Sequence, residues 1–218
     1  TGPTACNVHW PNEQMGLIGL PVPGTQVKLT PAAGKLEFRV KGPQVSPGYL
    51  GRPELSAQSF DADGFYLLGD AARFVAADEP QAGLAFDGRI SENFKLASGT
   101  FVTVGELRVK AVSAVGDGVT DAVVCGEGRE ALGLLFYPNP TWPREAVEAA
   151  VREGIARHNS AAQGSGGRIA RALVLATPPD PNAGEITDKG YIAQPIARTL
   201  RAGEVERLFS DATDVMVF

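Results

Sequence analysis

The chain has 218 residues, of which 44% are hydrophobic and 21% are charged, as is ordinary for a globular protein of one or two domains. Its formal net charge of −5 gives no electrostatic reason to expect nucleic acid or an anionic membrane as a partner. No segment approaches the roughly 20 consecutive apolar residues that a membrane-spanning helix needs. The sequence therefore predicts a protein that binds neither nucleic acid nor membranes.

Residues 1–88 are rich in glycine and proline and poor in helical periodicity. A short helix is predicted at 53–57, where Pro53 occupies the first helical position. Many short strands separated by turn signals predict a small, mostly β subdomain, either barrel-like or an open sheet. Alternation of apolar and polar residues predicts these strands at 26–29, 35–41, 65–68 and 84–86.

The character of the sequence changes near residue 90, where we place a domain boundary. Residues 92–218 are expected to form a compact α+β domain, so that the fold class of the chain is α+β. Strands are predicted at 94–96, 100–104, 121–125, 131–137 and 172–175. Helices are predicted at 106–115, from Pro143 to about His158, and over about 192–208.

The two cysteines, Cys6 and Cys125, are too few for a disulfide framework and fit a reducing, cytoplasmic compartment. Cys125 ends an apolar run and is expected to be a buried thiol. Cys6 and His9 have the spacing of half a zinc site. His158 is the only other histidine and there is no second cysteine pair, so we predict no metal site in this chain.

Two glycine-rich segments superficially match nucleotide-binding motifs. Gly126-x-Gly128-x-x-Ala131 follows a predicted strand, but a dinucleotide fingerprint needs a helix next, and the residues that follow are strand-like. A hairpin turn is therefore favoured there. Residues 164–168 lack the Gly-Lys-Ser/Thr ending of a phosphate loop, which favours a flexible connection.

Three other segments place charged residues beside glycines. The segment 65–70 ends in Asp70, just after a predicted strand and a glycine. The segment 88–99 sets cations at the expected domain boundary, and 184–190 carries a lysine in a polar loop. Any one of these segments alone would suit an ordinary solvated turn, so it is their order along the chain that is informative.

In this order the segments resemble the adenylate-forming superfamily of acyl-CoA synthetases, luciferases and peptide-synthetase adenylation domains, over nearly the whole chain. "YLLGDAA" at 66–72 is similar to the family's Y-x-x-GD segment, and "FDGRISENFKLASG" at 86–99 is similar to its hinge segment. Three segments are most similar to feruloyl-CoA synthetases, namely "TACNVHWP" at 4–11, "FDGRISENFKLASGTFVTVGELR" at 86–108 and "GEITDKGYI" at 184–192. The resemblance implies an AMP-forming acid–CoA ligase that uses ATP, Mg²⁺, coenzyme A and an aromatic or related small-molecule carboxylic acid.

The resemblance also implies roles for three charged residues. Asp70 would accept hydrogen bonds from the ribose hydroxyls of AMP, and Arg89 would reach the same ribose and phosphate region. Lys189 would be the catalytic lysine that contacts the carboxylate and the α-phosphate during adenylation, where a cation stabilises the transition state.

The same resemblance implies a hinge at Ser91 and Glu92, about which residues 92–218 would turn as a mobile cap. Lys95 and Gly99 would belong to the face that the cap presents for thioester formation. The chain departs from the family's pattern at the hinge, because Ser91 stands where an aspartate is usual. It departs again at Lys189, where Thr-Asp-Lys replaces the commoner Thr-x-x-Gly-Lys.

The family's phosphate-binding segment, acyl pocket and Mg²⁺ ligand would all precede Thr1. The resemblance therefore implies that residues 1–88 end an amino-terminal adenylation domain, and that the chain is a carboxy-terminal fragment needing that missing domain as its partner. Two alternatives stay open. The acyl acceptor could be a carrier-protein thiol instead of coenzyme A, or the chain could be a non-catalytic binding module.

Overall fold

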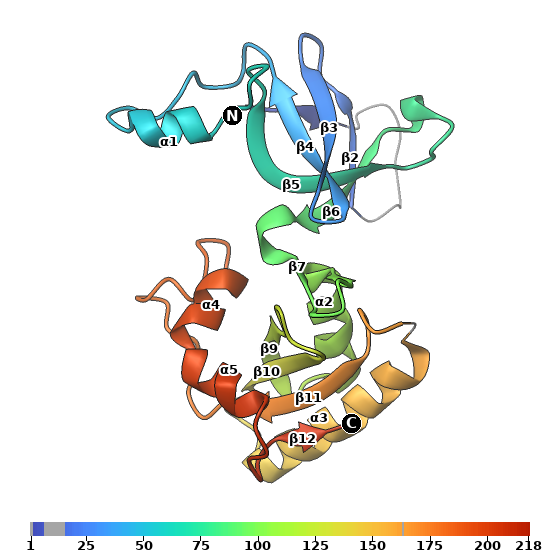
Figure 1. The fold of residues 1–218 in the computed structure, drawn as a ribbon, viewed down its shortest axis with the longest axis vertical. Coiled ribbons are helices and arrows are strands. Elements are labelled where there is room, and N and C mark those ends of the chain that lie inside the picture. The colour runs from blue at the N-terminus through green and yellow to red at the C-terminus, as the bar shows by residue number, and fades with distance from the viewer. Residues whose placement is uncertain (1, 7–15, 163) are drawn as a thin grey trace. The chain divides into compact units, whose positions relative to one another are not determined.

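The computed structural model describes residues 2–6, 16–162 and 164–218 of the chain (Figure 1). The chain divides into two compact units, Thr1–Ser91 and Glu92–Phe218. That the first unit ends an adenylation domain, and that the second is a mobile cap, stay predictions. No helix among the described residues has the length and apolar character to cross a membrane.

The first unit is built on a six-stranded sheet with the order β1-β2-β6-β5-β4-β3. Every neighbouring pair is antiparallel, and the pairing is that of an open sheet with β1 and β3 at its edges. The helix α1 (Pro53–Gln58) begins at the proline that predicts it. The strands are β1 (Ala5–Cys6), β2 (Leu17–Pro21), β3 (Gln26–Ala32), β4 (Lys35–Lys41), β5 (Tyr66–Phe74) and β6 (Leu84–Arg89).

Strand β5 corrects the sequence-based prediction that a strand ends before Asp70. It continues through Gly69 and Asp70 to Phe74, and it is visibly curved (Figure 1). Gly69 has a φ of 71°, and the pairing register with β6 shifts between Asp70 and Ala72. A β-bulge of this kind bends a strand without ending its ladder, so the glycine marks a bend here and not a terminus.

The second unit contains a mixed four-stranded sheet with the order β12-β11-β10-β9. Its central strands β10 and β11 are parallel, and the other pairs are antiparallel. A two-stranded ribbon of β7 (Phe94–Lys95) and β8 (Phe101–Val102) precedes it. The strands of the larger sheet are β9 (Val119–Cys125), β10 (Leu132–Pro138), β11 (Ile169–Val174) and β12 (Met216–Val217).

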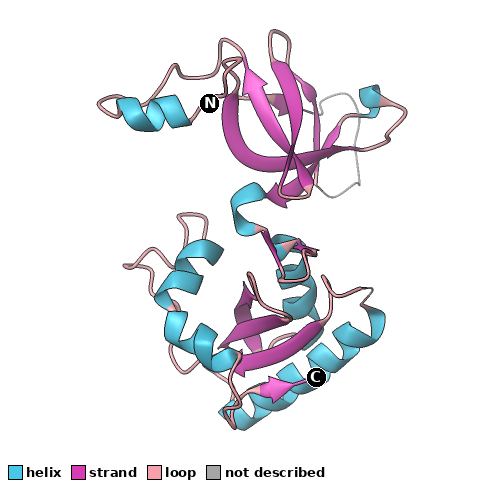
Figure 2. Ribbon diagram, in the orientation of Figure 1, coloured by secondary structure: helices cyan, strands magenta, loops and turns pink. Residues whose placement is uncertain are grey.

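Helices cover both faces of this sheet (Figure 2). Because side chains alternate along a strand, Leu134 and Phe136 of β10 pack with α2 (Val104–Val115) and α3 (Arg144–Ala161). Leu135 and Tyr137 point to the other face, beside α4 (Gln194–Leu200) and α5 (Ala202–Leu208). A strand buried on both faces has a continuous apolar sequence, as residues 132–137 do.

Two predictions about the second unit can be checked directly. The turn between β9 and β10 joins antiparallel strands, which confirms the hairpin at Gly126–Ala131. The single helix predicted over about 192–208 is two helices, because α4 ends at Leu200 and α5 begins at Ala202. Arg201 lies at the break, where its φ is −97° and ψ is 26°. Pro195 is the second residue of α4, within its first turn, and so does not interrupt the helix.

Candidate active site

Asp70 and Arg89 lie directly opposite each other across β5 and β6. The Nε atom of Arg89 is 3.0 Å from Oδ1 of Asp70, and the two side chains are 53% and 29% exposed. Asp70 directly follows the bend at Gly69 in β5, and Arg89 is the last residue of β6. A carboxylate and a planar set of donors, paired but solvent-accessible, suit the recognition of hydroxyl and phosphate groups.

A second ion pair fixes the end of β6. Lys35 is the first residue of β4, and its Nζ atom is 2.9 Å from Oδ1 of Asp87. The same ammonium group donates a hydrogen bond to the backbone carbonyl of Asp87. The Lys35 side chain is 10% exposed and that of Asp87 is 31% exposed, so this contact is partly shielded from solvent. Since Asp87 precedes Arg89 by two residues, Lys35 helps to hold the strand end that carries Arg89.

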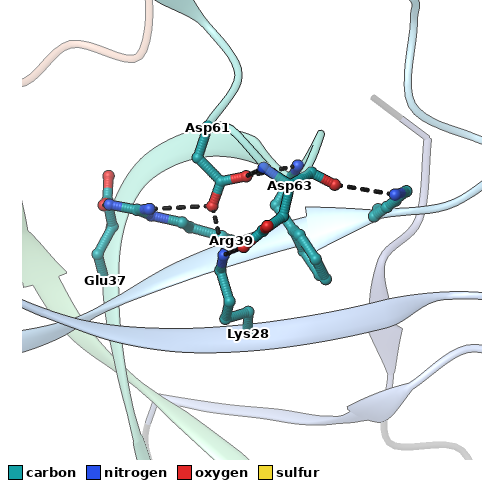
Figure 3. Close-up of polar contacts among 7 residues, drawn as sticks. Lys28, Glu37, Arg39, Asp61 and Asp63 are labelled. Atoms are coloured by element: carbon teal, nitrogen blue, oxygen red, sulfur yellow. Dashed lines mark hydrogen bonds and ion pairs between the residues drawn. The ribbon is translucent and has the colours of Figure 1, made fainter.

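Figure 3 shows a larger polar network in the first unit, formed by Lys28, Glu37, Arg39, Asp61 and Asp63. Asp61 is at its centre, 2.6 Å from Nζ of Lys28 and 3.0 Å from Nη1 of Arg39. Hydrogen bonds from Lys28 and from the backbone N–H of Phe65 hold the pKa of Asp61 well below its usual range. Every charge in this network has a partner. We therefore interpret it as a structural link between β3, β4 and the turn that leads into β5.

Lys189 lies in a tight hairpin immediately before α4, which we call the lysine hairpin (residues 186–192). Ile186 and Ile192 form a bridge at its base, and the backbone N–H of Thr187 donates to the carbonyl of Tyr191 at 2.8 Å. Gly190 has a φ of 81° and closes the turn by donating to the carbonyl of Thr187 at 2.9 Å. Lys189 itself is exposed at the tip, where its ammonium group is accessible to an anionic ligand.

A buried carboxylate lies at the base of the lysine hairpin. Glu185 is 1% exposed, and its two oxygens accept from Nε and Nη2 of Arg201 at 2.8 and 3.0 Å. Tyr137 also donates its hydroxyl to Glu185, and the backbone N–H of Asp180 donates at 2.7 Å. Burial alone would raise the pKa of Glu185, but hydrogen bonds from Arg201 and Tyr137 outweigh it and hold that pKa below its ordinary value. Sequence reasoning missed this group, because nothing local indicates that Glu185 is buried or paired with Arg201.

Lys95 ends strand β7, where it pairs with Phe101 of β8, and Gly99 lies in the loop between these two strands. Nζ of Lys95 lies 4.5 Å from the ring centroid of Phe101, so the exposed lysine is held against an aromatic face. Gly99 has a φ of 83°, and a Cβ atom added there would meet nothing within 4 Å. The positive φ, and not crowding, is what favours glycine at this position. The roles of both residues in thioester formation stay predictions.

Ser91 and Glu92 lie in a short 3₁₀ helix (Ile90–Glu92) between β6 and β7. Ser91 is the last residue of the first unit, and Glu92 is the first residue of the second. Their assignment as a hinge stays a prediction.

The described residues contain no group of three or more histidine, cysteine, aspartate or glutamate side chains placed to hold a metal ion. Cys6 is exposed, and His9, the other residue of the zinc-like spacing, lies outside the described residues. The prediction of a buried thiol is confirmed, because Cys125 is inaccessible and burial raises the pKa of its thiol to about 12. His158 has a structural partner, the carbonyl of Gly167 at 2.8 Å.

Comparison with known proteins agrees with the fold. Residues 108–213 match the family model described as the AMP-binding enzyme C-terminal domain. A carboxylic acid reductase from Segniliparus rugosus is 26% identical over 185 residues, which is 82% of this chain and 15% of that protein. A long-chain-fatty-acid–CoA ligase from Cavia porcellus is 29% identical over 135 residues, 58% of this chain and 18% of that protein.

A solved structure shows the same architecture. It is the adenylation domain of a carboxylic acid reductase from Segniliparus rugosus, in complex with AMP and a co-purified carboxylic acid. The match has a TM-score of 0.73 and 24% sequence identity, and it covers 88% of this chain and 32% of that one. The chain thus spans about a third or less of the length of these relatives.

Proposed function

We propose that the chain takes part in activating a carboxylic acid with ATP. The proposal starts from the match of residues 108–213 to the carboxy-terminal domain of AMP-binding enzymes. In the first half-reaction a carboxylate oxygen attacks the α-phosphorus, and pyrophosphate leaves. In the second, a thiol sulfur attacks the acyl carbon, and AMP leaves. The observation that carries the proposal is the exposed Lys189, presented at the tip of an anchored hairpin within this domain.

Lys189 would act in the first half-reaction. Negative charge builds on the phosphoryl oxygens as pyrophosphate departs, and a fixed cation beside them lowers the barrier. The exposure of Lys189 supports this role, because its ammonium group is available to an incoming phosphate.

Asp70 and Arg89 would hold the nucleotide. The Asp70 carboxylate accepts from ribose hydroxyls, while Arg89 restrains that carboxylate and offers its remaining guanidinium donors to the ribose and phosphate. Their in-register pairing at 3.0 Å supports this, since each side chain fixes the other before a ligand arrives.

Lys95 and Gly99 would act in the second half-reaction, after rotation about Ser91 and Glu92. The open space around Gly99 supports this, because a narrow pantetheine arm could pass there. Mg²⁺ would accompany ATP, with its protein ligand in the region that precedes these residues in an adenylation domain. The catalytic unit would then be this chain together with that region.

We propose an aromatic acid of the ferulate type as substrate and coenzyme A as acceptor, which the segments at 4–11, 86–108 and 184–192 support. A carrier-protein thiol is the second candidate acceptor, because a long-chain-fatty-acid–acyl-carrier-protein ligase from Arabidopsis thaliana is among the relatives. The relatives include a fatty-acid–CoA ligase as well, so both acceptors have a counterpart among them.

The test uses the complete enzyme, in which these residues follow the region that matches the rest of the relatives. With ATP, Mg²⁺ and ferulate, we expect acid-dependent exchange of labelled pyrophosphate into ATP, and then formation of feruloyl-CoA and AMP when coenzyme A is added. A phosphopantetheinylated carrier protein, added instead, should accept no acyl group. Acylation of the carrier alone would favour the second candidate. Absence of exchange with every acid tested would favour a non-catalytic binding module.

A further inference from the structure

The base of the lysine hairpin is fixed to the second unit through Glu185. The backbone N–H of Ala193, which directly follows the hairpin, donates to the carbonyl of Glu185 at 2.9 Å. The backbone N–H of Glu185 in turn donates to the carbonyl of Asp180 at 3.1 Å. Glu185 therefore connects both ends of the hairpin to the loop that precedes it.

The side chain of Glu185 is fully engaged. Its two oxygens accept four hydrogen bonds, two from Arg201, one from Tyr137 and one from the N–H of Asp180. A carboxylate has about four acceptor positions, so its capacity is used up. Because Glu185 is also only 1% exposed, it cannot touch a substrate, and any influence on chemistry must pass through the hairpin.

The partners of Glu185 are themselves anchored in rigid parts of the unit. Tyr137 is 1% exposed in the central strand β10. Arg201 occupies the break between α4 and α5, and its Nη2 also donates to the carbonyl of Pro178 at 2.7 Å. The hydrogen bonds of Glu185 and Arg201 thus connect the sheet, the break between α4 and α5 and the loop 177–180. They meet at the base of the lysine hairpin.

Stability alone does not account for this arrangement. A buried ion pair gives little net stability compared with well-packed apolar residues, because both charges must lose their water. A bidentate arginine–carboxylate pair does supply a fixed direction, since its two parallel hydrogen bonds allow only one relative orientation. The segment next to this ion pair is the lysine hairpin, which carries Lys189 at its tip.

We propose that Glu185 is a positioning residue, which through Arg201 and Tyr137 sets the direction of the lysine hairpin so that Lys189 reaches the reacting phosphate. This inference rests on the proposed function of Lys189. A misplacement of about 1 Å can cost about 100-fold in rate. Because Lys189 acts in adenylation, loss of the Glu185 contact should slow adenylation and leave thioester formation intact.

The test compares Glu185→Gln with wild type in the complete enzyme. We expect acid-dependent ATP–pyrophosphate exchange to fall about 10- to 100-fold, through kcat more than through KM for ATP, as expected for a displaced catalytic group. Thioester formation from supplied acyl-adenylate should stay within about twofold of wild type. Exchange of the hydrogen-bonded amide protons of Thr187 and Tyr191 with solvent should become faster.

Glu204→Gln is the matched control. Glu204 also pairs with Arg201, through Nη1 at 3.5 Å, but its side chain is 39% exposed and it holds no part of the hairpin. This variant should retain wild-type rates in both half-reactions. Tyr137→Phe removes one hydrogen-bond donor to Glu185 while keeping the ring, and it should give a smaller loss confined to adenylation.

Three results would overturn the proposal: wild-type adenylation in Glu185→Gln, equal loss of both half-reactions in that variant, or an effect of the same size in Glu204→Gln. If Glu185→Gln does not fold, Tyr137→Phe decides, and wild-type adenylation in it counts against positioning. The Lys189→Ala variant distinguishes failure of the positioning role of Glu185 from failure of the proposed function of Lys189. If Lys189→Ala loses adenylation and Glu185→Gln keeps it, only the positioning role fails; if Lys189→Ala keeps it, the proposed function of Lys189 fails as well.

Discussion

Lys189→Ala in the complete enzyme is expected to slow adenylate formation by about 10²–10³-fold, the usual effect of removing one preorganised group that stabilises transition-state charge. Thioester formation from supplied acyl-adenylate should remain within about twofold, because in the proposed mechanism rotation about Ser91 and Glu92 takes Lys189 away from the phosphate before that step. The exposed tip of the lysine hairpin makes this substitution structurally mild. Pyrophosphate exchange and single-turnover thioester formation measure the two steps separately.

Lys110→Ala is the control for this experiment. Lys110 is another exposed lysine of the second unit, paired with Glu106 one helical turn away on α2. The Lys110→Ala variant should leave the rates of both half-reactions unchanged. Equal loss of the two steps in Lys189→Ala would contradict a role specific to adenylation, and so would an equal effect of Lys110→Ala.

Arg201→Ala is expected to lower the unfolding free energy of the second unit by about 3–5 kcal/mol, because it leaves Glu185 charged, buried and without its main partner. Arg207→Ala is the matched control, since its ion pair with Asp214 at 2.9 Å is largely exposed. Surface pairs of this kind contribute less than about 1 kcal/mol. Denaturant unfolding of both variants at pH 7 gives the comparison.

The effect of Arg201→Ala should depend on pH in a defined direction. In the wild-type chain, burial would raise the pKa of Glu185, but Arg201 and Tyr137 hold that pKa low. The stabilisation is therefore present at neutral pH and is lost as the pH falls below about 4, the usual range for a glutamate. Without Arg201, burial dominates and the folded variant takes up a proton more readily. The difference from wild type should then shrink between pH 7 and about pH 4, and a difference that stays constant would contradict the argument.

Local sequence patterns predicted the strands and helices in which apolar residues recur at one regular spacing. Residues 35–41 alternate clearly and form β4, and the apolar face after Pro143 forms α3. Patterns failed where the backbone departs from regularity. The bulge at Gly69 reads as a strand end, although pairing with β4 and β6 carries β5 past it. The two-residue strand β12 (Met216–Val217) is too short for any alternation to be visible.

The residues of the candidate site fall into the same two groups, those that local sequence predicts and those that only the folded chain reveals. Asp70, Arg89 and Lys189 stand in recognisable local contexts, so sequence singled them out. The in-register pairing of Asp70 with Arg89 follows from sheet topology, which no local pattern contains. Glu185 and Arg201 are 16 positions apart, with a hairpin and a helix between them, and only the folded chain shows that they meet.

The fate of the carboxylate oxygens tests the central claim most directly. A carboxylic acid that supports pyrophosphate exchange is labelled in both carboxylate oxygens with oxygen-18 and turned over by the complete enzyme with ATP and coenzyme A. If the acid is activated as an acyl-adenylate, one labelled oxygen bridges to the α-phosphorus and leaves with AMP when the thiol attacks. We therefore predict AMP that carries one heavy oxygen and pyrophosphate that carries none. Unlabelled AMP, or label in inorganic phosphate with ADP as the product, would contradict the account.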